Sequence, residues 1–342
     1  MVKLLGKTPQ ELSAEVGGCG LKPFVGKQIA QWLYEKRVRS FDEMTNLSKE
    51  ARQLLPQRVS LGITDPIGKA VSSDGTAKYL FASETSVIES VVIPDGDRRT
   101  LCVSSQAGCA MNCKFCMTGR GGFHGQLDPA EILNQFISVD EAGQLTNAVF
   151  MGMGEPMANY DAVTRAIEVL TAPWGFAWSP KRITVSTIGV IPALIRYLDG
   201  QKCHLAISLH NPFGNERLEL MPVEKVYPIK DVVDIVRRYD WSGQRRVSFE
   251  YTMFAGWNDS KRHADALIRL LKGLECRVNL IRFHKIPDFP YGTSAANVME
   301  DFRDRLNNNG ITCTIRASRG EDIMAACGLL AGQVAKNGDS AL

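Results

Sequence analysis

The spacing of hydrophobic positions changes twice along the chain. In residues 1–58 it follows the period of an α-helix, as it does from Phe24 to Tyr34. In residues 59–98 apolar and polar positions alternate, and two such runs flank the polar turn Ser83–Thr85. The pattern therefore predicts a small helical domain over residues 1–58, followed by a short β-strand extension over residues 59–98.

From residue 99 onward, strand patterns alternate with helical patterns. The expected strands are Thr100–Ser104, Ala148–Gly152, Arg182–Ser186, His204–Ser208, Arg246–Tyr251 and Arg277–Phe283. The helical patterns between them are Asp128–Glu141, Tyr160–Leu170, Ile229–Tyr239 and Ser260–Leu271. Alternation of this kind predicts an α/β fold with a parallel sheet. Six units are fewer than the eight of a TIM barrel, so we expect a partial (β/α)6 barrel over residues 99–290. Residues 291–342 should add a helix, a strand and a loop.

The composition is that of a folded protein in an aqueous compartment. Apolar residues make up 44% of the chain and charged residues 23%, which is ordinary for a globular domain. No apolar stretch approaches the about 20 residues that a bilayer span needs, and the first ten residues lack a signal-peptide pattern. We therefore expect a cytoplasmic monomer that does not bind membranes.

Charge is distributed unevenly along the chain. The net charge is +3, but residues 1–58 hold ten Lys and Arg against six Asp and Glu, a surplus of four. Trp32 and Tyr34 lie among these cations, so the helical domain is a candidate surface for docking nucleic acid. The alternatives are a solvated helical face for the charges and burial in the core for Trp32.

Three of the nine cysteines, Cys109, Cys113 and Cys116, form a CxxxCxxC run just after the first barrel strand. Structural zinc sites usually take four protein ligands, and iron–sulfur cubanes are usually held by four cysteines. Three thiolates would leave one iron of a cubane open to a small chelating molecule. A zinc site that borrows a distant Cys or His is the alternative.

The other candidate residues also follow expected strands. Gly152–Pro156 (GMGEP) follows the second strand, and its glycines would let the backbone approach a ligand closely. Ser186 ends the third strand, Ser208–His210 ends the fourth and His284 follows the sixth. In α/β folds the carboxyl ends of parallel strands meet at one edge of the sheet. We therefore expect a single site there.

Together these motifs resemble those of the radical S-adenosylmethionine (SAM) superfamily. The CxxxCxxC run is similar to its signature, and Gly152–Pro156 resembles its GGEP-type motif. Further stretches in family order narrow the resemblance to the RlmN family of dual-specificity RNA adenine-C2 methyltransferases. These stretches are Met44–Ser48, Thr100–Gln106, Ser208–His210 and Arg319–Gly328.

The resemblance implies a [4Fe-4S] cluster on Cys109, Cys113 and Cys116, and a reaction that uses two SAM molecules. One SAM would methylate Cys327, and the radical from the other would take a hydrogen from that methyl group. The resulting radical would add to carbon 2 of adenine, and Cys102 would then release the product by forming a disulfide with Cys327.

The resemblance also assigns supporting roles. Glu89 would accept the proton lost from carbon 2 of the base. SAM would be bound by Gly154, Glu155, Ser186, Ser208, Leu209, His210 and His284. Many relatives have Asn where this chain has His284, and both side chains can hydrogen-bond adenine or ribose.

The implied substrates are an adenosine of 23S rRNA in the peptidyl-transferase centre and the tRNA adenosine beside the anticodon. An electron donor such as flavodoxin would reduce the cluster. Three alternatives stay open at this point. They are a Cfr-like enzyme that methylates carbon 8 and confers antibiotic resistance, a zinc-stabilised RNA-binding module, and a radical enzyme that acts on a small substrate.

Overall fold

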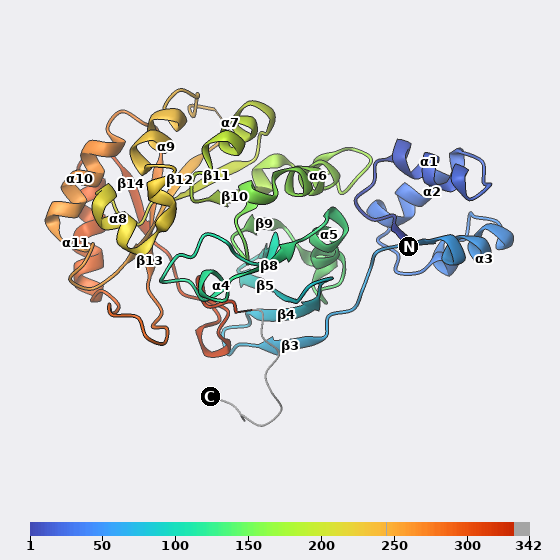
Figure 1. The fold of residues 1–342 in the computed structure, drawn as a ribbon, viewed down its shortest axis with the longest axis horizontal. Helices are drawn as coiled ribbons and strands as arrows, with labels where there is room; N and C mark the ends of the chain where they lie inside the picture. Colours follow the sequence, from blue (N-terminus) through green and yellow to red (C-terminus); the bar gives the residue numbers. More distant parts are fainter. Residues whose placement is uncertain (244, 332–342) are drawn as a thin grey trace.

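A single ten-stranded sheet organises the protein. The computed structural model describes residues 1–243 and 245–331, and Figure 1 shows their arrangement. Along the sheet the strands lie in the order β14 (Thr312–Ile315), β13 (Arg277–Arg282), β12 (Val247–Met253), β11 (His204–Ser208), β10 (Ile183–Thr187), β9 (Asn147–Phe150), β6 (Arg98–Cys102), β5 (Val87–Asp95), β4 (Ala77–Ala82) and β3 (Gly68–Val71).

The sheet has a parallel part and an antiparallel part. Strands β6 and β9 to β14 run parallel to one another, whereas β3, β4 and β5 form antiparallel pairs on the other side of β6. The edge strands are β14 and β3, so the barrel stays open, and the expected partial α/β barrel is confirmed. It contains one more parallel strand than the six expected, because β14 pairs with β13.

Helices connect the parallel strands, as expected for βαβ units. They are α5 (Pro129–Ile137), α6 (Tyr160–Thr171), α7 (Ile191–Gly200), α8 (Gly214–Leu220), α9 (Ile229–Val236), α10 (Lys261–Leu271) and α11 (Ala296–Asn307). Two short strands, β7 (Gln106–Gly108) and β8 (Phe123–Gln126), flank α4 (Met117–Arg120). Short helical turns span Phe41–Glu43, Ala142–Gln144, Pro156–Asn159, Pro180–Arg182, Pro222–Lys225 and Glu321–Ile323.

The first 60 residues form a separate group of helices, which Figure 1 shows at one end of the molecule. They comprise α1 (Pro9–Gly18), α2 (Phe24–Ala30) with a π-helical turn (Gln31–Glu35), α3 (Lys49–Arg58), and strands β1 (Val2–Lys3) and β2 (Val59–Ser60). Thr8 and Glu11 form a capping box, which satisfies the free N–H groups of the first turn of α1. The expected helices are therefore confirmed.

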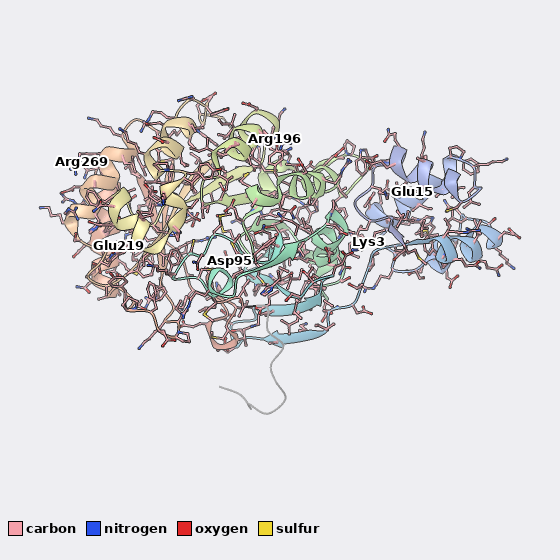
Figure 2. The ribbon with its side chains drawn as sticks, in the orientation of Figure 1. Lys3, Glu15, Asp95, Arg196, Glu219 and Arg269 are labelled. Atoms are coloured by element: carbon pink, nitrogen blue, oxygen red, sulfur yellow. The ribbon has the colours of Figure 1, made fainter. Side chains whose placement is uncertain are left out.

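The helical group packs against the barrel at several points. Lys3, labelled in Figure 2, places its Nζ 2.7 Å from Oδ2 of Asp128. Tyr34 is fully buried, and its ring centroid lies 5.6 Å from that of Trp174. Tyr34 therefore cannot face RNA, which corrects the expectation for that residue. Trp32 is only partly buried, and Nζ of Lys36 lies 3.8 Å from its ring centroid.

The central parallel strands are buried on both faces. In β11, Leu205 and Ile207 point to one face of the sheet and Ala206 points to the other, and all three are fully buried. Burying a Leu or Ile side chain contributes about 1.5–3 kcal/mol, so these strands form a rigid base for the loops at their carboxyl ends. Within the described residues, no helix is both long enough and apolar enough to cross a membrane.

Candidate active site

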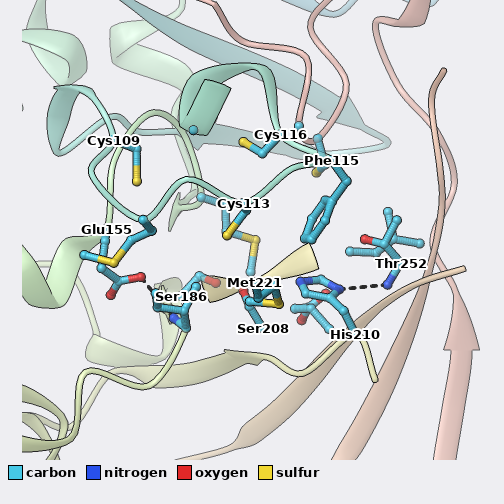
Figure 3. A pocket seen from close by; sticks show the side chains of 18 of the residues that line it. Cys109, Cys113, Phe115, Cys116, Glu155, Ser186, Ser208, His210, Met221 and Thr252 are labelled. Atoms are coloured by element: carbon cyan, nitrogen blue, oxygen red, sulfur yellow. Dashed lines mark hydrogen bonds between the residues drawn. The ribbon is translucent and has the colours of Figure 1, made fainter. Parts of the chain in front are cut away.

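The three cysteines of the CxxxCxxC run line one cavity of about 170 Å³ at the carboxyl ends of the strands (Figure 3). Asn112 adopts a left-handed conformation with φ of 50°, which turns the loop between Cys109 and Cys113. The backbone N–H of Cys116 donates to the carbonyl oxygen of Cys113 at 3.1 Å. Burial raises the pKa of Cys109 to about 12 and also raises that of Cys113. In the absence of a metal these two thiols are therefore protonated.

The three thiols can serve as the protein ligands of an iron–sulfur cubane. Among the described residues, no group of three or more His, Cys, Asp or Glu side chains is arranged to hold a metal ion. A cubane takes each thiolate on a different iron, so its ligands stand farther apart than those of one ion. Cys109, Cys113 and Cys116 lie on the wall of one cavity, where each could bind a different iron. Cluster binding would deprotonate them.

Glu155 forms a buried part of the same cavity. Its Oε1 accepts a hydrogen bond from the N–H of Met157 at 3.0 Å, and its Oε2 accepts one from Ile188 at 3.0 Å. Burial raises the pKa of Glu155 to about 7, although these hydrogen bonds favour the charged form. The preceding Gly154 has φ of 96°, and a Cβ there would lie 2.4 Å from Cβ of Gln106. Only glycine fits at that position.

His210 faces the three cysteines across the cavity (Figure 3). Its Nδ1 accepts a hydrogen bond from the N–H of Thr252 at 3.0 Å, and burial lowers the pKa of the ring to about 3. The imidazole is therefore neutral and carries its hydrogen on Nε2. Ser186 and Ser208 also line this cavity, whereas Leu209 is fully buried and does not line it.

A second cavity, of about 350 Å³, adjoins the first. Cys116, Arg316 and Cys327 are among the residues that line both. Cys102 lines only the second cavity, where most of the charged side chains are cationic: Arg98, Arg282, Arg316 and Arg319, against Asp95. This second cavity is therefore suited to an anionic ligand.

His284 lines the second cavity and not the first. Its Nε2 lies 2.8 Å from Oγ of Ser318, and its Nδ1 lies 3.2 Å from Oε1 of Glu321. The structure thus separates His284 from the other residues expected to contact SAM, and places it against the segment that leads to Cys327.

Arg316 lies close enough to the two candidate catalytic thiols, Cys102 and Cys327, to lower the pKa of each. Its Nη1 lies 3.3 Å from Oε2 of the buried Glu250. Burial raises the pKa of Cys102 to about 12, and the Arg316 guanidinium lowers it in part. Cys327 is solvent-exposed as a residue, but protein atoms crowd its thiol and raise its pKa, again against the effect of Arg316.

The nine cysteines all lie within the described residues, and all are free. The expected disulfide between Cys102 and Cys327 is therefore not a standing bond of the protein. Cys203 and Cys313 are buried, as expected for packing residues, and Cys19 and Cys276 are partly buried.

Glu89 is buried on β5 but lines neither cavity. Its Oε1 accepts a hydrogen bond from the N–H of Ala331 at 3.3 Å, and its Oε2 lies 3.5 Å from Nζ of Lys78. The carboxylate thus contacts the chain just after Cys327. The side chain of Glu89 is therefore buried and does not point outward into solvent from its strand.

Three cavity residues were missed in the sequence. Glu250 is a lone carboxylate in the apolar strand Val247–Met253, which was a usable signal. Thr252 follows on the same strand and contributes its backbone N–H to His210. Arg316 directly follows β14, a strand that was not counted in the barrel.

Comparison with known proteins agrees with this geometry. Residues 103–267 match the family model described as the Radical SAM superfamily, and residues 2–61 match the model of the ribosomal RNA large subunit methyltransferase N-terminal domain, RlmN_N. The fold is similar to the crystal structure of a radical SAM methyltransferase from Sphaerobacter thermophilus, with a TM-score of 0.92 and 38% identity over 97% of this chain and 100% of that one.

Curated relatives narrow the assignment. A probable dual-specificity RNA methyltransferase RlmN of Porphyromonas gingivalis is 55% identical over 98% of both chains. The dual-specificity RNA methyltransferase RlmN of Syntrophus aciditrophicus is 41% identical over 95% of this chain and 94% of the relative. The fold and the site thus define a radical SAM methyltransferase. The chain belongs to the RlmN family of dual-specificity RNA methyltransferases.

Proposed function

We propose that this enzyme methylates carbon 2 of adenosine in 23S rRNA and in tRNA beside the anticodon, with a [4Fe-4S] cluster and SAM as cofactors. One observation carries the proposal. Cys327 lies where the cavity of the three cysteines meets the cationic cavity that contains Cys102. A one-carbon unit on Cys327 would therefore face both a cofactor site and an RNA site.

The first cavity is the proposed SAM site. The cluster, when bound by Cys109, Cys113 and Cys116, supplies the one-electron reductive cleavage of SAM. Glu155, freed of its proton, offers a carboxylate to the ammonium group of the ligand, and the neutral His210 offers an Nε2–H donor. Gly154, Ser186 and Ser208 complete the contacts, with Leu209 as a support from behind. For His284, which lines the second cavity, we propose a role beside the RNA substrate in place of the expected contact with SAM.

Cys327 and Cys102 transfer the one-carbon unit from SAM to the base. The Cys327 thiolate attacks the methyl group of one SAM, which leaves as S-adenosylhomocysteine. The 5′-deoxyadenosyl radical from the other SAM would then take a hydrogen atom from this methyl group and leave as 5′-deoxyadenosine. The remaining methylene carbon would bond to carbon 2 of the base, and the adduct would return one electron to the cluster. The Cys102 thiolate then attacks Sγ of Cys327. The sulfur–carbon bond then breaks, its electron pair stays with carbon, and that carbon takes up a proton. The resulting transient disulfide is reduced by an external two-electron donor.

Glu89 is the proposed acceptor of the proton that leaves carbon 2. A positioned carboxylate can take a proton from a reacting group, and Glu89 is buried and contacts the backbone of Ala331. The segment that carries Cys327 therefore joins the proposed base to the proposed methyl carrier.

The remaining parts of the chain serve the substrate. We assign RNA docking to residues 1–58, whose cationic surplus attracts phosphates. Residues 59–98 are the β extension, 99–290 the barrel, and 291–342 the segment of Cys327, which continues beyond the described residues. The enzyme would act as a cytoplasmic monomer, with a donor such as flavodoxin.

Mass mapping of treated RNA tests the proposal. The protein, reconstituted anaerobically with iron and sulfide, is incubated with SAM, a reductant and either a 23S rRNA fragment or tRNA. We expect 2-methyladenosine in both RNAs. Methylation at carbon 8 alone would instead support the Cfr-like alternative, which the RlmN_N match over residues 2–61 disfavours. A protein that binds zinc and never cleaves SAM would be an RNA-binding module.

A further inference from the structure

The segment that carries Cys327 is fixed on its C-terminal side to the helix that follows the CxxxCxxC run. The N–H of Met117 donates to the carbonyl oxygen of Gly328 at 2.8 Å. Oγ1 of Thr118 donates to the carbonyl oxygen of Leu330 at 2.6 Å. These contacts leave the N-terminal side of Cys327 to be held by something else.

On that side, residues 320–324 contact the turn between β3 and β4, residues 72–76, which we call the hairpin turn. Oδ1 of Asp322 accepts a hydrogen bond from Oγ of Ser72 at 2.5 Å, and Oδ2 accepts one from the N–H of Ser73 at 3.1 Å. In return, Oδ2 of Asp74 accepts a hydrogen bond from the N–H of Gly320 at 3.0 Å. Each segment thus supplies one carboxylate that accepts hydrogen bonds from the other segment.

Close packing accompanies these hydrogen bonds. Gly320 has φ of 64°, and a Cβ there would lie 2.8 Å from Cγ2 of Thr76 and 2.9 Å from Cβ of Ala325. Nζ of Lys78 also donates to the carbonyl oxygen of Met324 at 3.5 Å. The hairpin turn, together with Lys78 on β4, therefore contacts Gly320, Asp322 and Met324, all within the seven residues before Cys327.

The charge state of this contact does not change around physiological pH. Partial burial raises the pKa of Asp74, but hydrogen bonds from Thr76 and Gly320 outweigh it and hold the pKa at about 2. Asp322 is likewise held below its ordinary pKa by Ser72 and Ser73. Both carboxylates are charged near neutral pH, so the contact is a fixed structural link and not a pH switch.

We propose that the hairpin turn positions Cys327 for transfer between the two cavities, with Asp74 and Asp322 as the positioning residues. The proposal rests on the proposed role of Cys327 as methyl carrier. A misplacement of about 1 Å can slow a bound reaction by about 10²-fold. Loss of the link should therefore impair transfer to RNA more than it impairs cleavage of SAM, which occurs at the other end of the site.

Three variants test the link. Asp322→Ala removes both hydrogen bonds. Asp322→Asn preserves them, because its oxygen can accept from Ser73 while its amide donates to Oγ of Ser72. In Asp74→Asn, one of the N–H groups of Thr76 and Gly320 loses its acceptor whichever way the amide turns. The matched control is Asp97→Asn, at an exposed aspartate in the turn between β5 and β6.

The readout is the amount of 5′-deoxyadenosine formed per adenosine methylated. A loss of folded protein would lower both products equally and leave this ratio unchanged. Thermal unfolding and iron content show that each variant is folded and loaded. We expect the ratio to rise about fivefold or more in Asp322→Ala and Asp74→Asn, and to stay at the wild-type value in Asp322→Asn and Asp97→Asn.

The outcomes separate this proposal from the proposed function. If wild-type protein methylates RNA in a Cys327-dependent way, but Asp322→Ala and Asp74→Asn keep the wild-type ratio, the positioning role is wrong and the function stands. If wild-type protein methylates no RNA, or Cys327→Ala retains methylation, the proposed function fails before the hairpin turn is tested.

Discussion

The N–H of Met117 donates a 2.8 Å hydrogen bond to the carbonyl oxygen of Gly328, so the residue after Cys116 is joined to the residue after Cys327. Two segments far apart in the chain thus share one anchor beside both cavities. Order in the CxxxCxxC loop should therefore be transmitted to the segment of the proposed methyl carrier.

Removal of iron should loosen that segment. A cluster fixes the loop of its three ligands, and its loss frees the loop that precedes Met117. We expect faster hydrogen exchange in residues 325–331 of the iron-free protein than in the loaded protein, with no change in β11. Equal exchange in residues 325–331 would show that the two segments are not coupled.

Arg217 should be essential for stability, because it is a fully buried cation. It donates to the carbonyl oxygen of Ser208 at 2.9 Å and forms an ion pair with Glu224. Arg217→Met leaves Glu224 buried without its cation, and should lower the free energy of unfolding by about 3–5 kcal/mol. The exposed Arg196–Asp161 pair is the control, since Arg196→Met should cost less than about 1 kcal/mol. Urea denaturation of both variants gives the comparison.

Glu155 should make stability depend on pH. Its pKa in the folded protein is about 7, above the ordinary glutamate value of 4.5, so the folded state binds more protons than the unfolded state between these values. Stability therefore falls as pH rises through this window, by about 3 kcal/mol. Glu155→Gln removes this pH-dependent contribution. The free energy of unfolding of the variant should therefore rise relative to that of the wild type between pH 4.5 and 7. Urea midpoints that keep a constant difference across the window would contradict this expectation.

Arg316 should promote ionisation of Cys327. The guanidinium lowers the pKa of this thiol, so Arg316→Met should raise it further and reduce the thiolate present at a given pH. The rate of Cys327 alkylation by iodoacetamide, followed by peptide mass spectrometry, should reach its midpoint at higher pH in the variant. Arg269→Met, on the exposed side of α10, should leave the profile unchanged.

Local patterns in the sequence identified most of the fold. The strand His204–Ser208 was predicted with its observed bounds, because an apolar run between polar residues and a helix on either side is typical of a buried parallel strand. The capping box of Thr8 and Glu11 also follows from the sequence, since capping depends on neighbouring residues only. The strand β14 was not counted in the barrel because its role depends on pairing with β13.

Residues whose surroundings depend on contacts between distant segments could not be placed from the sequence. The motif residues of the first cavity each follow a strand, so topology alone brings them together. Tyr34 could not be recognised as buried, because the ring that covers it, Trp174, lies in another part of the chain. The hydrogen bonds of His284 to Ser318 and of Asp322 to Ser72 likewise depend on how whole segments pack.

The most direct test of the account is to trap the RNA on Cys327. Cys102→Ala removes the proposed resolving thiol, so transfer should stop with the base still bonded to the protein. Reconstituted Cys102→Ala, incubated with SAM, reductant and RNA, should yield a covalent adduct that peptide and nucleoside mass spectrometry map to Sγ of Cys327, one methylene group and carbon 2 of adenine. Cys102→Ala that turns over to free 2-methyladenosine, or an adduct mapped to any other residue, would contradict the account.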